Sequence, residues 1–124
     1  MHENALSKAK ELQDRTKRFA VRIVRMFKAL PKTDEARVIG KQVLRSGTSV
    51  AANYRAACRA RSKAEFAAKI GIVLVEIDET VFWMELLVET EIVSMGKMKE
   101  LMNEASELLA IFAASRSTAR GKVR

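Results

Sequence analysis

The chain has 124 residues, 48% of them hydrophobic and 31% charged, with a formal net charge of +8. This length suits one domain with a real core, and an aromatic content of 6% with a single proline favours helices over sheets. There is no apolar run near the ~20 residues of a membrane span and no export signal, and the single Cys58 excludes an intrachain disulfide. We therefore expect a cytoplasmic, all-α protein.

Charge is distributed unevenly along the sequence. Residues 1–61 carry 15 basic and 5 acidic side chains, whereas residues 62–93 carry 2 basic and 7 acidic ones. Either the basic segments meet a polyanion, or basic and acidic helices pair within an assembly.

The first helix is expected over residues 4–30, and Pro31 ends it. Its apolar residues recur at alternating spacings of four and three, as in a coiled-coil-like seam: Leu12, Thr16, Phe19, Ile23, Met26 and Leu30. Its back carries a ladder of guanidinium groups, formed by Arg15, Arg18, Arg22 and Arg25. Such a ladder is either a solvated face or a contact for a polyanion.

The second helix is expected over residues 34–61, with Thr33 as its N-cap. Gly40 and Gly47 interrupt its apolar side, where they allow another helix to approach closely. Its opposite side is basic and includes Arg37, Lys41 and Arg45.

The third helix is expected over residues 63–91, because Ser62 and Glu65 form a capping box ahead of an apolar run. One broad apolar arc fits a bundle core. A second apolar arc contains Ile72, Val75, Phe82, Trp83 and Leu86. Since a lone bundle of this size needs one apolar stripe per helix, the second arc predicts a subunit interface.

Glu76 and Glu79 lie within this second arc and require a partner. The very short turn at residues 61–62 makes helices two and three antiparallel neighbours, so opposed residue numbers sum to about 124 and Arg45 faces Glu79. We predict a structural ion pair of Arg45 with Glu76 and Glu79, supplied within the chain or by a neighbouring subunit. An acid/base pair of the two glutamates is the alternative.

The fourth helix is expected over residues 95–115, after Ser94 as its N-cap. Residues 1–115 would then form one four-helix domain. The basic tail, residues 116–124, has no apolar periodicity, so we expect it to be disordered and a candidate polyanion-binding arm through Arg116 and Arg120.

Catalytic and metal-binding motifs are missing from the sequence. The only histidine is His2, there is no glycine-rich phosphate loop, and no Ser-His-Asp, Cys-His or metal-ligand spacing occurs. We expect no catalytic residues, no metal, no cofactor and no enzyme activity. The helices are too long for a helix-turn-helix reader, so any nucleic-acid contact should be to phosphates.

The segment QVLRSGTSVAANYRAACRARSKAEFAAKIGIVLVEIDETVFWMELL, with NEASELLAI in the last helix, resembles the 23S rRNA-intervening-sequence protein family. The similarity covers about residues 12–115, and its most specific parts are residues 45–54 and 76–86. It implies an up-down-up-down antiparallel bundle that assembles as a homopentamer. A related branch, the accessory variability determinant proteins of diversity-generating retroelements, forms basic pentamers that associate with a reverse transcriptase and nucleic acid; this sequence resembles that branch less.

Two functions are left open by the sequence. The first is a homo-oligomeric scaffold whose basic surface binds RNA or DNA backbones through Arg15, Arg18, Arg22, Arg25, Arg37, Lys41 and the tail. The second is an adaptor or assembly module that recruits another protein without a nucleic-acid role. Binding to phosphates should weaken steeply with salt, whereas an apolar protein interface should not.

Overall fold

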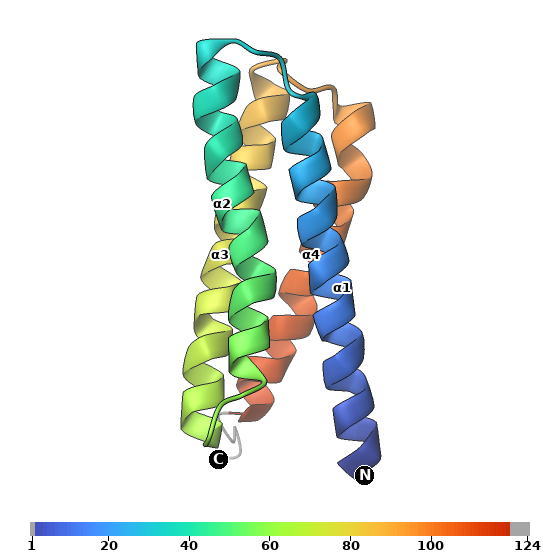
Figure 1. The fold of residues 1–124 in the computed structure, drawn as a ribbon, viewed down its shortest axis with the longest axis vertical. Coiled ribbons are helices and arrows are strands. Elements are labelled where there is room, and N and C mark those ends of the chain that lie inside the picture. Colours follow the sequence, from blue (N-terminus) through green and yellow to red (C-terminus); the bar gives the residue numbers. More distant parts are fainter. Residues whose placement is uncertain (1, 120–124) are drawn as a thin grey trace.

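A computed structural model describes residues 2–119, with side chains from residue 7 onward. It contains four helices: α1 (His2–Ala29), α2 (Asp34–Ala57), α3 (Lys63–Glu89) and α4 (Met95–Ala119). Each helix runs antiparallel to the preceding one and is joined to it by a short turn (Figure 1). The described chain is therefore all-α and forms an up-down bundle, as the sequence predicts.

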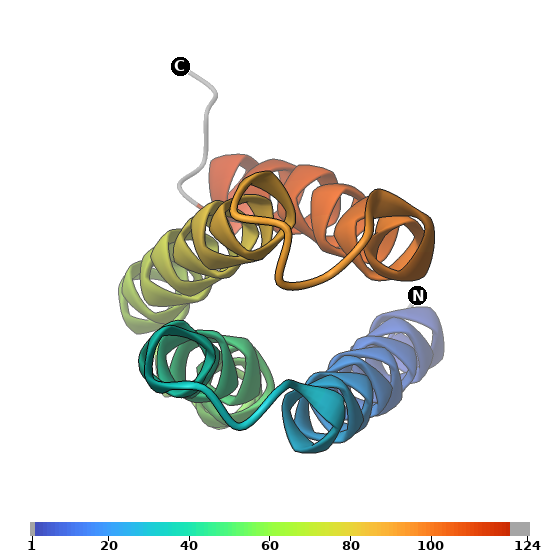
Figure 2. The same cartoon turned by 90° about the horizontal axis from the view of Figure 1, so that it is seen from above.

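Neighbours in sequence are also neighbours in space. α1 packs on α2, α2 on α3 and α3 on α4, whereas α1 and α4 contact each other only sparsely. Figure 2 shows this arrangement from above, with the helices at four corners and the loosest side between α1 and α4. The bundle is thus closed by a sparse contact between its first and last helices, which we call the α1–α4 seam.

Three of the helices begin at the predicted N-caps. The hydroxyl groups of Thr33, Ser62 and Ser94 accept hydrogen bonds from the backbone N–H three residues later, at 3.3, 3.0 and 3.3 Å. The Glu65 carboxylate reaches back and accepts from the Arg61 N–H at 3.2 Å. These bonds satisfy amide groups that have no acceptor within the helix.

The core is drawn from all four helices. The predicted stripe of α1 lies inward, with Thr16, Phe19, Ile23 and Leu30 buried and Leu12 and Met26 partly buried. α3 contributes the most fully buried side chains, in keeping with its contacts to both α2 and α4. The largest of the fully buried side chains are Phe19, Phe112, Ile23, Ile70, Ile77, Met84, Leu87, Met98 and Leu108.

Small residues on α2 set how closely its neighbours approach. A Cβ on Gly47 would stand 2.8 Å from Cγ1 of Ile23, so this glycine admits the α1 side chain. On the α3 side, Ser46 is fully buried and its Oγ accepts a hydrogen bond of 2.8 Å from the hydroxyl of Thr80. Gly47 and Ser46 therefore let α2 pack closely against α1 and α3, respectively.

The helix ends differ from the sequence expectation by one or two residues in α1 and α3 and by four residues in α2 and α4. α2 ends at Ala57 instead of residue 61, because the N–H groups of Arg59 and Ala60 bond carbonyls three residues earlier and tighten the chain into a turn. α4 continues to Ala119 instead of ending at residue 115, so the first four residues of the expected disordered tail are helical. Residues 120–124 lie outside the described residues.

No helix in the described part of the chain is both long and apolar enough to cross a membrane.

Candidate functional site

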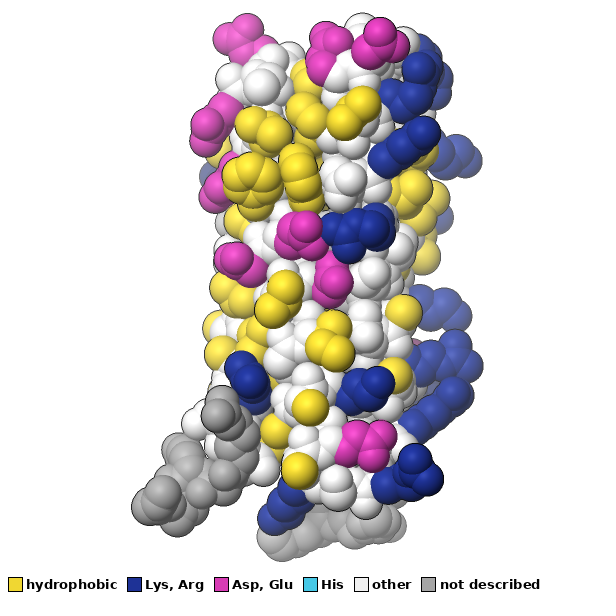
Figure 3. Space-filling view, turned by 90° about the vertical axis from the view of Figure 1, so that its left-hand side faces the viewer, with side chains coloured by type: hydrophobic (Ala, Val, Ile, Leu, Met, Phe, Trp, Pro, Cys, Tyr) yellow, Lys and Arg dark blue, Asp and Glu magenta, His cyan; other side chains and the backbone are white. Residues whose placement is uncertain are grey.

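The outward side of α2 and α3 exposes large apolar side chains. Ile72, Val75 and Phe82 of α3 are 42%, 64% and 52% exposed, and Val38 of α2 is 64% exposed. Figure 3 looks at this side and shows hydrophobic side chains above and below a group of charges of both signs. We call this surface, including the charged trio Arg45, Glu76 and Glu79, the α2–α3 face.

Trp83 and Leu86 complete the predicted interface set, but both are partly buried within their own chain. Trp83 packs against the core, and the Phe82 ring meets its indole edge-on with ring centroids 4.9 Å apart. The indole Nε1 is buried and has no acceptor among the described residues. The bundle itself therefore covers part of Trp83, and the place of Trp83 and Leu86 in a subunit interface stays a prediction. The large indole lies at the edge of its arc and reaches inward, so the exposed apolar face depends on Phe82, Val75 and Ile72.

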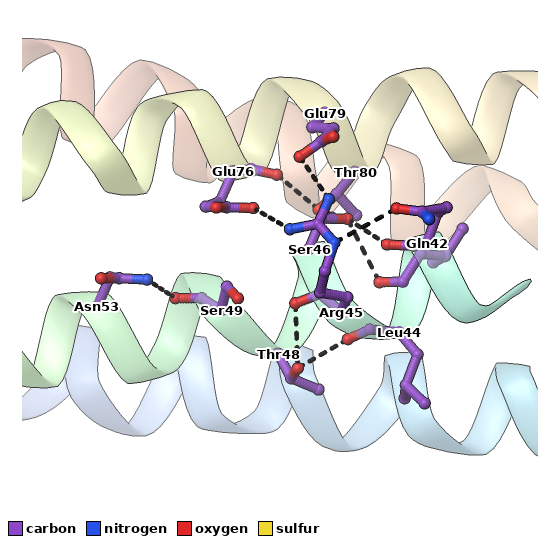
Figure 4. Close-up of polar contacts among 11 residues, drawn as sticks. Gln42, Leu44, Arg45, Ser46, Thr48, Ser49, Asn53, Glu76, Glu79 and Thr80 are labelled. Atoms are coloured by element: carbon purple, nitrogen blue, oxygen red, sulfur yellow. Dashed lines mark hydrogen bonds and ion pairs between the residues drawn. The ribbon is translucent and has the colours of Figure 1, made fainter. Parts of the chain in front are cut away.

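A charged trio ties α2 to α3 at the middle of this face (Figure 4). The Arg45 guanidinium lies 2.7 Å from the Glu79 carboxylate and 3.3 Å from that of Glu76, and its Nε donates to Gln42 at 3.3 Å. The hydrogen bond to Glu79 raises the pKa of Arg45, which keeps it charged. Both carboxylates are engaged by one arginine of the same chain, which is the geometry of a structural ion pair and not of a free acid/base pair.

Arg45→Ala should lower the melting temperature, and weaken the self-association that the sequence predicts, more than Arg18→Ala does. The first substitution leaves Glu76, whose side chain is 18% exposed, without its arginine, whereas Arg18 is exposed and has no carboxylate within 4 Å among the described side chains. Thermal unfolding followed by circular dichroism, with sedimentation velocity on the same samples, measures both. Equal effects of the two alanine variants would contradict this role for Arg45.

The arginine ladder of α1 lies against acidic side chains of α4 at the loose α1–α4 seam. Arg15 bonds Glu104 through Nε at 2.7 Å and Nη2 at 2.8 Å, and Nη2 also reaches Glu107 at 2.6 Å. The bond from Arg15 holds the pKa of Glu104 below its usual range, with further lowering by the charges of Arg22 and Arg18. Arg15 is therefore engaged within the chain, and the ladder is in part a clamp between the first and last helices.

Arg15→Gln should lower the free energy of unfolding by about 2 kcal/mol, since it removes charge-assisted bonds to a carboxylate that is only 17% exposed. Urea unfolding at neutral pH and fixed protein concentration measures the loss. Arg18→Gln, which removes the same charge from the same helix, is the control and should change stability by less than about 0.5 kcal/mol. A loss no larger than that of the control would show that the seam is not held by this pair.

Acid should weaken the same seam. Because the pKa of Glu104 is lower in the folded chain, its contribution to stability is present above the unfolded carboxyl pKa of about 4.3 and is lost as the pH falls through the folded value. Unfolding free energies measured from about pH 6 to pH 3 should therefore fall more steeply for the native chain than for Glu104→Gln. Parallel curves would contradict the assignment.

The other predicted basic residues are placed in different ways. Arg18, Arg25, Arg37 and Lys41 are exposed and Arg22 is partly exposed; Arg37 lies 3.8 Å from Asp34. Arg116 is on α4, where its guanidinium lies 3.2 Å from the position of a Cβ on Gly71, and its buried Nε has no partner among the described residues. Arg116 thus packs against α3 in the part of α4 that extends beyond the expected helix end. Arg120 lies outside the described residues.

A basic groove between α1 and α2 is a surface that sequence reasoning missed. It has a volume of about 520 Å³, and cations line both walls: Lys10 and Lys17 from α1, Arg55 from α2 and Arg59 from the turn after α2. Residue numbers of opposed α1 and α2 positions sum to about 70, as at Ile23 and Gly47. This register, which the structure supplies, places Lys17 near Arg55 and Lys10 near Arg59. The basic residues are visible in the sequence, but the pairing of α1 with α2 that brings them together is not.

Within the described residues, no group of three or more His, Cys, Asp or Glu side chains is placed to hold a metal ion.

Comparison with known proteins fits this architecture. The model of the 23S rRNA-intervening sequence protein family matches residues 8–114. The chain belongs to that family. A crystal structure described as a protein of unknown function from the S23 ribosomal protein family of Bacteroides thetaiotaomicron VPI-5482 is 37% identical, with a TM-score of 0.83, over 89% of this chain and 98% of that one. A comparison with curated proteins found no match.

Membership in the 23S rRNA-intervening sequence protein family confirms the resemblance drawn from residues 45–54 and 76–86. The family is one of unknown function, and neither match indicates a catalytic family.

Proposed function

We propose that this protein is a non-enzymatic, homo-oligomeric scaffold that assembles through the α2–α3 face and binds nucleic-acid backbones through its basic surface. The observation that carries the proposal is the exposure of Ile72, Val75 and Phe82 along one side of α3, at 42%, 64% and 52%. A second copy of the chain would remove this apolar surface from water, with a gain of about 25 cal/mol for each Å².

The charged trio on this face is compatible with burial between subunits. Arg45 already satisfies Glu76 and Glu79 within one chain, so an interface that covers them buries a paired group and not an isolated charge. Packing of this face on a different surface of the next copy gives a head-to-tail contact, which closes into a ring when the rotation between subunits allows it. Five copies is the number that the family resemblance implies.

The basic surface supports the second half of the proposal. In Figure 3, Lys and Arg side chains gather along the edge formed by α1 and α2, whereas acidic side chains occupy the upper part of the opposite edge. With a net charge of +8 per chain, an assembly presents this basic edge in several copies. Repeated cationic surfaces favour a polyanion, because each lysine or arginine that meets a phosphate releases counterions.

Fluorescence anisotropy with a labelled single-stranded RNA of about 20 nucleotides tests nucleic-acid binding by the native chain. With three phosphate contacts, affinity should fall about 20-fold between 50 and 200 mM salt, since the logarithmic slope is about −0.7 per contact. Sedimentation on the same samples should show an assembly that persists at the higher salt. An intact assembly with no affinity for RNA at low salt would reject nucleic-acid binding and favour the protein adaptor.

A further inference from the structure

We propose that the groove between α1 and α2 is the track that holds the nucleic-acid backbone, in place of the arginine ladder that the sequence suggests. This inference rests on the proposed function and names the site within it. Its charged lining consists of Lys10, Asp14, Lys17, Arg55 and Arg59. The helical segments that carry the first four of these residues lie in the lower halves of α1 and α2 in Figure 1.

The cations of the groove are largely free to meet phosphates. Asp14 is the one acidic residue of the lining, and it is paired with Lys10 at 2.9 Å. Among side chains that the structure describes, no carboxylate lies within 4 Å of Lys17, Arg55 or Arg59. The groove therefore offers three unpaired cations.

The spacing of these cations suits an extended polyanion better than a single small anion. Lys10 and Lys17 are seven residues apart on α1, a rise of about 10 Å. Arg55 in the last turn of α2 and Arg59 in the turn that follows α2 line the other wall. Charges on both walls over this length can contact successive phosphates of one strand.

The arginine ladder on the other side of α1, unlike the groove, lies close to acidic side chains of α4. Arg15 is bonded to Glu104 and Glu107, and the charges of Arg18 and Arg22 act on the same Glu104 carboxylate. A phosphate that approached the ladder would also meet these carboxylates. The acidic side chains of α4 thus weaken the ladder as a polyanion site, whereas the groove has no such neighbour on α2.

The floor of the groove determines whether the bound nucleic-acid strand is recognised by its bases or by its backbone. It is formed by Thr48, Ala51 and Ala52, whose small side chains let a backbone lie close to α2, and its lining contains no aromatic residue on which a base could stack. Contacts should therefore be to phosphates and sugars and should depend little on sequence.

The groove lies on a different side of α2 from the α2–α3 face. α2 directs Arg45 toward α3 and the α2–α3 face, whereas Thr48 and Arg55 line the groove toward α1. A second copy that packs on the α2–α3 face leaves the groove of the first copy open, provided that the second copy does not use its own groove for this contact. Simultaneous assembly and nucleic-acid binding is therefore part of the proposal.

Two triple variants with equal loss of charge test the groove. K17Q/R55Q/R59Q removes its unpaired cations, and R18Q/R25Q/R37Q removes three exposed arginines elsewhere on α1 and α2. Anisotropy with the 20-nucleotide RNA is measured at several salt concentrations, and sedimentation and circular dichroism check the assembly and the fold. The groove variant should lose at least about tenfold in affinity, and its salt slope should fall by about 2, at 0.7 per lost contact. The control should stay within about threefold of the native chain.

These measurements distinguish a failure of the groove as the binding site from a failure of nucleic-acid binding itself. If the groove variant keeps its RNA affinity while the control variant loses it, the groove is not the binding site. If both variants lose RNA affinity equally, the groove is not the specific site either. Both results would leave nucleic-acid binding by the protein in place. No RNA binding by the native chain would overturn both. If K17Q/R55Q/R59Q does not fold, the single variants Lys17→Gln and Arg55→Gln should each lower the salt slope by about 0.7, and an unchanged slope in both would count against the groove.

Discussion

Phe82→Glu should convert the assembled protein into a folded monomer of 13.9 kDa. Phe82 is 52% exposed in its own chain, so a glutamate there remains solvated in the monomer and should leave the helical content unchanged. In the proposed assembly the same carboxylate would be buried against an apolar surface of the next copy, at a cost of several kcal/mol per contact. Sedimentation velocity measures the mass, and far-ultraviolet circular dichroism measures the fold.

Val24→Glu is the matched control for this substitution. Val24 is also a partly exposed apolar residue, at 37%, but it lies on α1 away from the α2–α3 face. Its glutamate variant should sediment like the native chain. If both variants kept the native mass, or if both dissociated, the α2–α3 face would not be the specific surface of self-association.

Phe112→Ala should lower the free energy of unfolding by about 4 kcal/mol and the melting temperature by about 15 °C. Phe112 is fully buried on α4, and its ring lies 5.0 Å from that of Tyr54 between centroids. Because α4 contacts α1 only sparsely, its attachment depends on such side chains at the centre of the bundle. The cavity left by alanine should therefore loosen the last helix as well as lower global stability.

This substitution is best measured in the Phe82→Glu background, where dissociation of an oligomer does not add to the unfolding free energy. Phe112→Leu, which retains most of the buried volume, should cost about 1 kcal/mol there. A loss below about 1 kcal/mol for the alanine variant would show that the α4 core can collapse around the cavity and is not packed as described.

The parts of the molecule that the sequence predicts well are those fixed by local signals. The hydroxyl N-caps at Thr33, Ser62 and Ser94 need only a side chain and an amide three residues later, so they are readable from short motifs. The short turn between α2 and α3 likewise fixes their register, which is why Arg45 could be matched with Glu79 from residue numbers alone.

Other features depend on contacts that no local pattern specifies. Arg15 and Glu104 are 89 residues apart on the first and last helices, and no turn sets their register. A helical wheel assigns Trp83 to one arc, but the size of the indole lets it reach the core from the edge of that arc. Residues 116–119 are helical although they carry no apolar repeat, and among them Arg116 packs beside Gly71 of α3. Each miss is a case in which tertiary packing outweighs the local pattern.

Light scattering of the native chain after size-exclusion chromatography, in dilute buffer at physiological salt, measures self-association directly. A ring of five copies predicts a single species of about 70 kDa, five times the chain mass of 13.9 kDa. A single species near 13.9 kDa, with Ile72, Val75 and Phe82 in contact with water, would contradict the proposed scaffold.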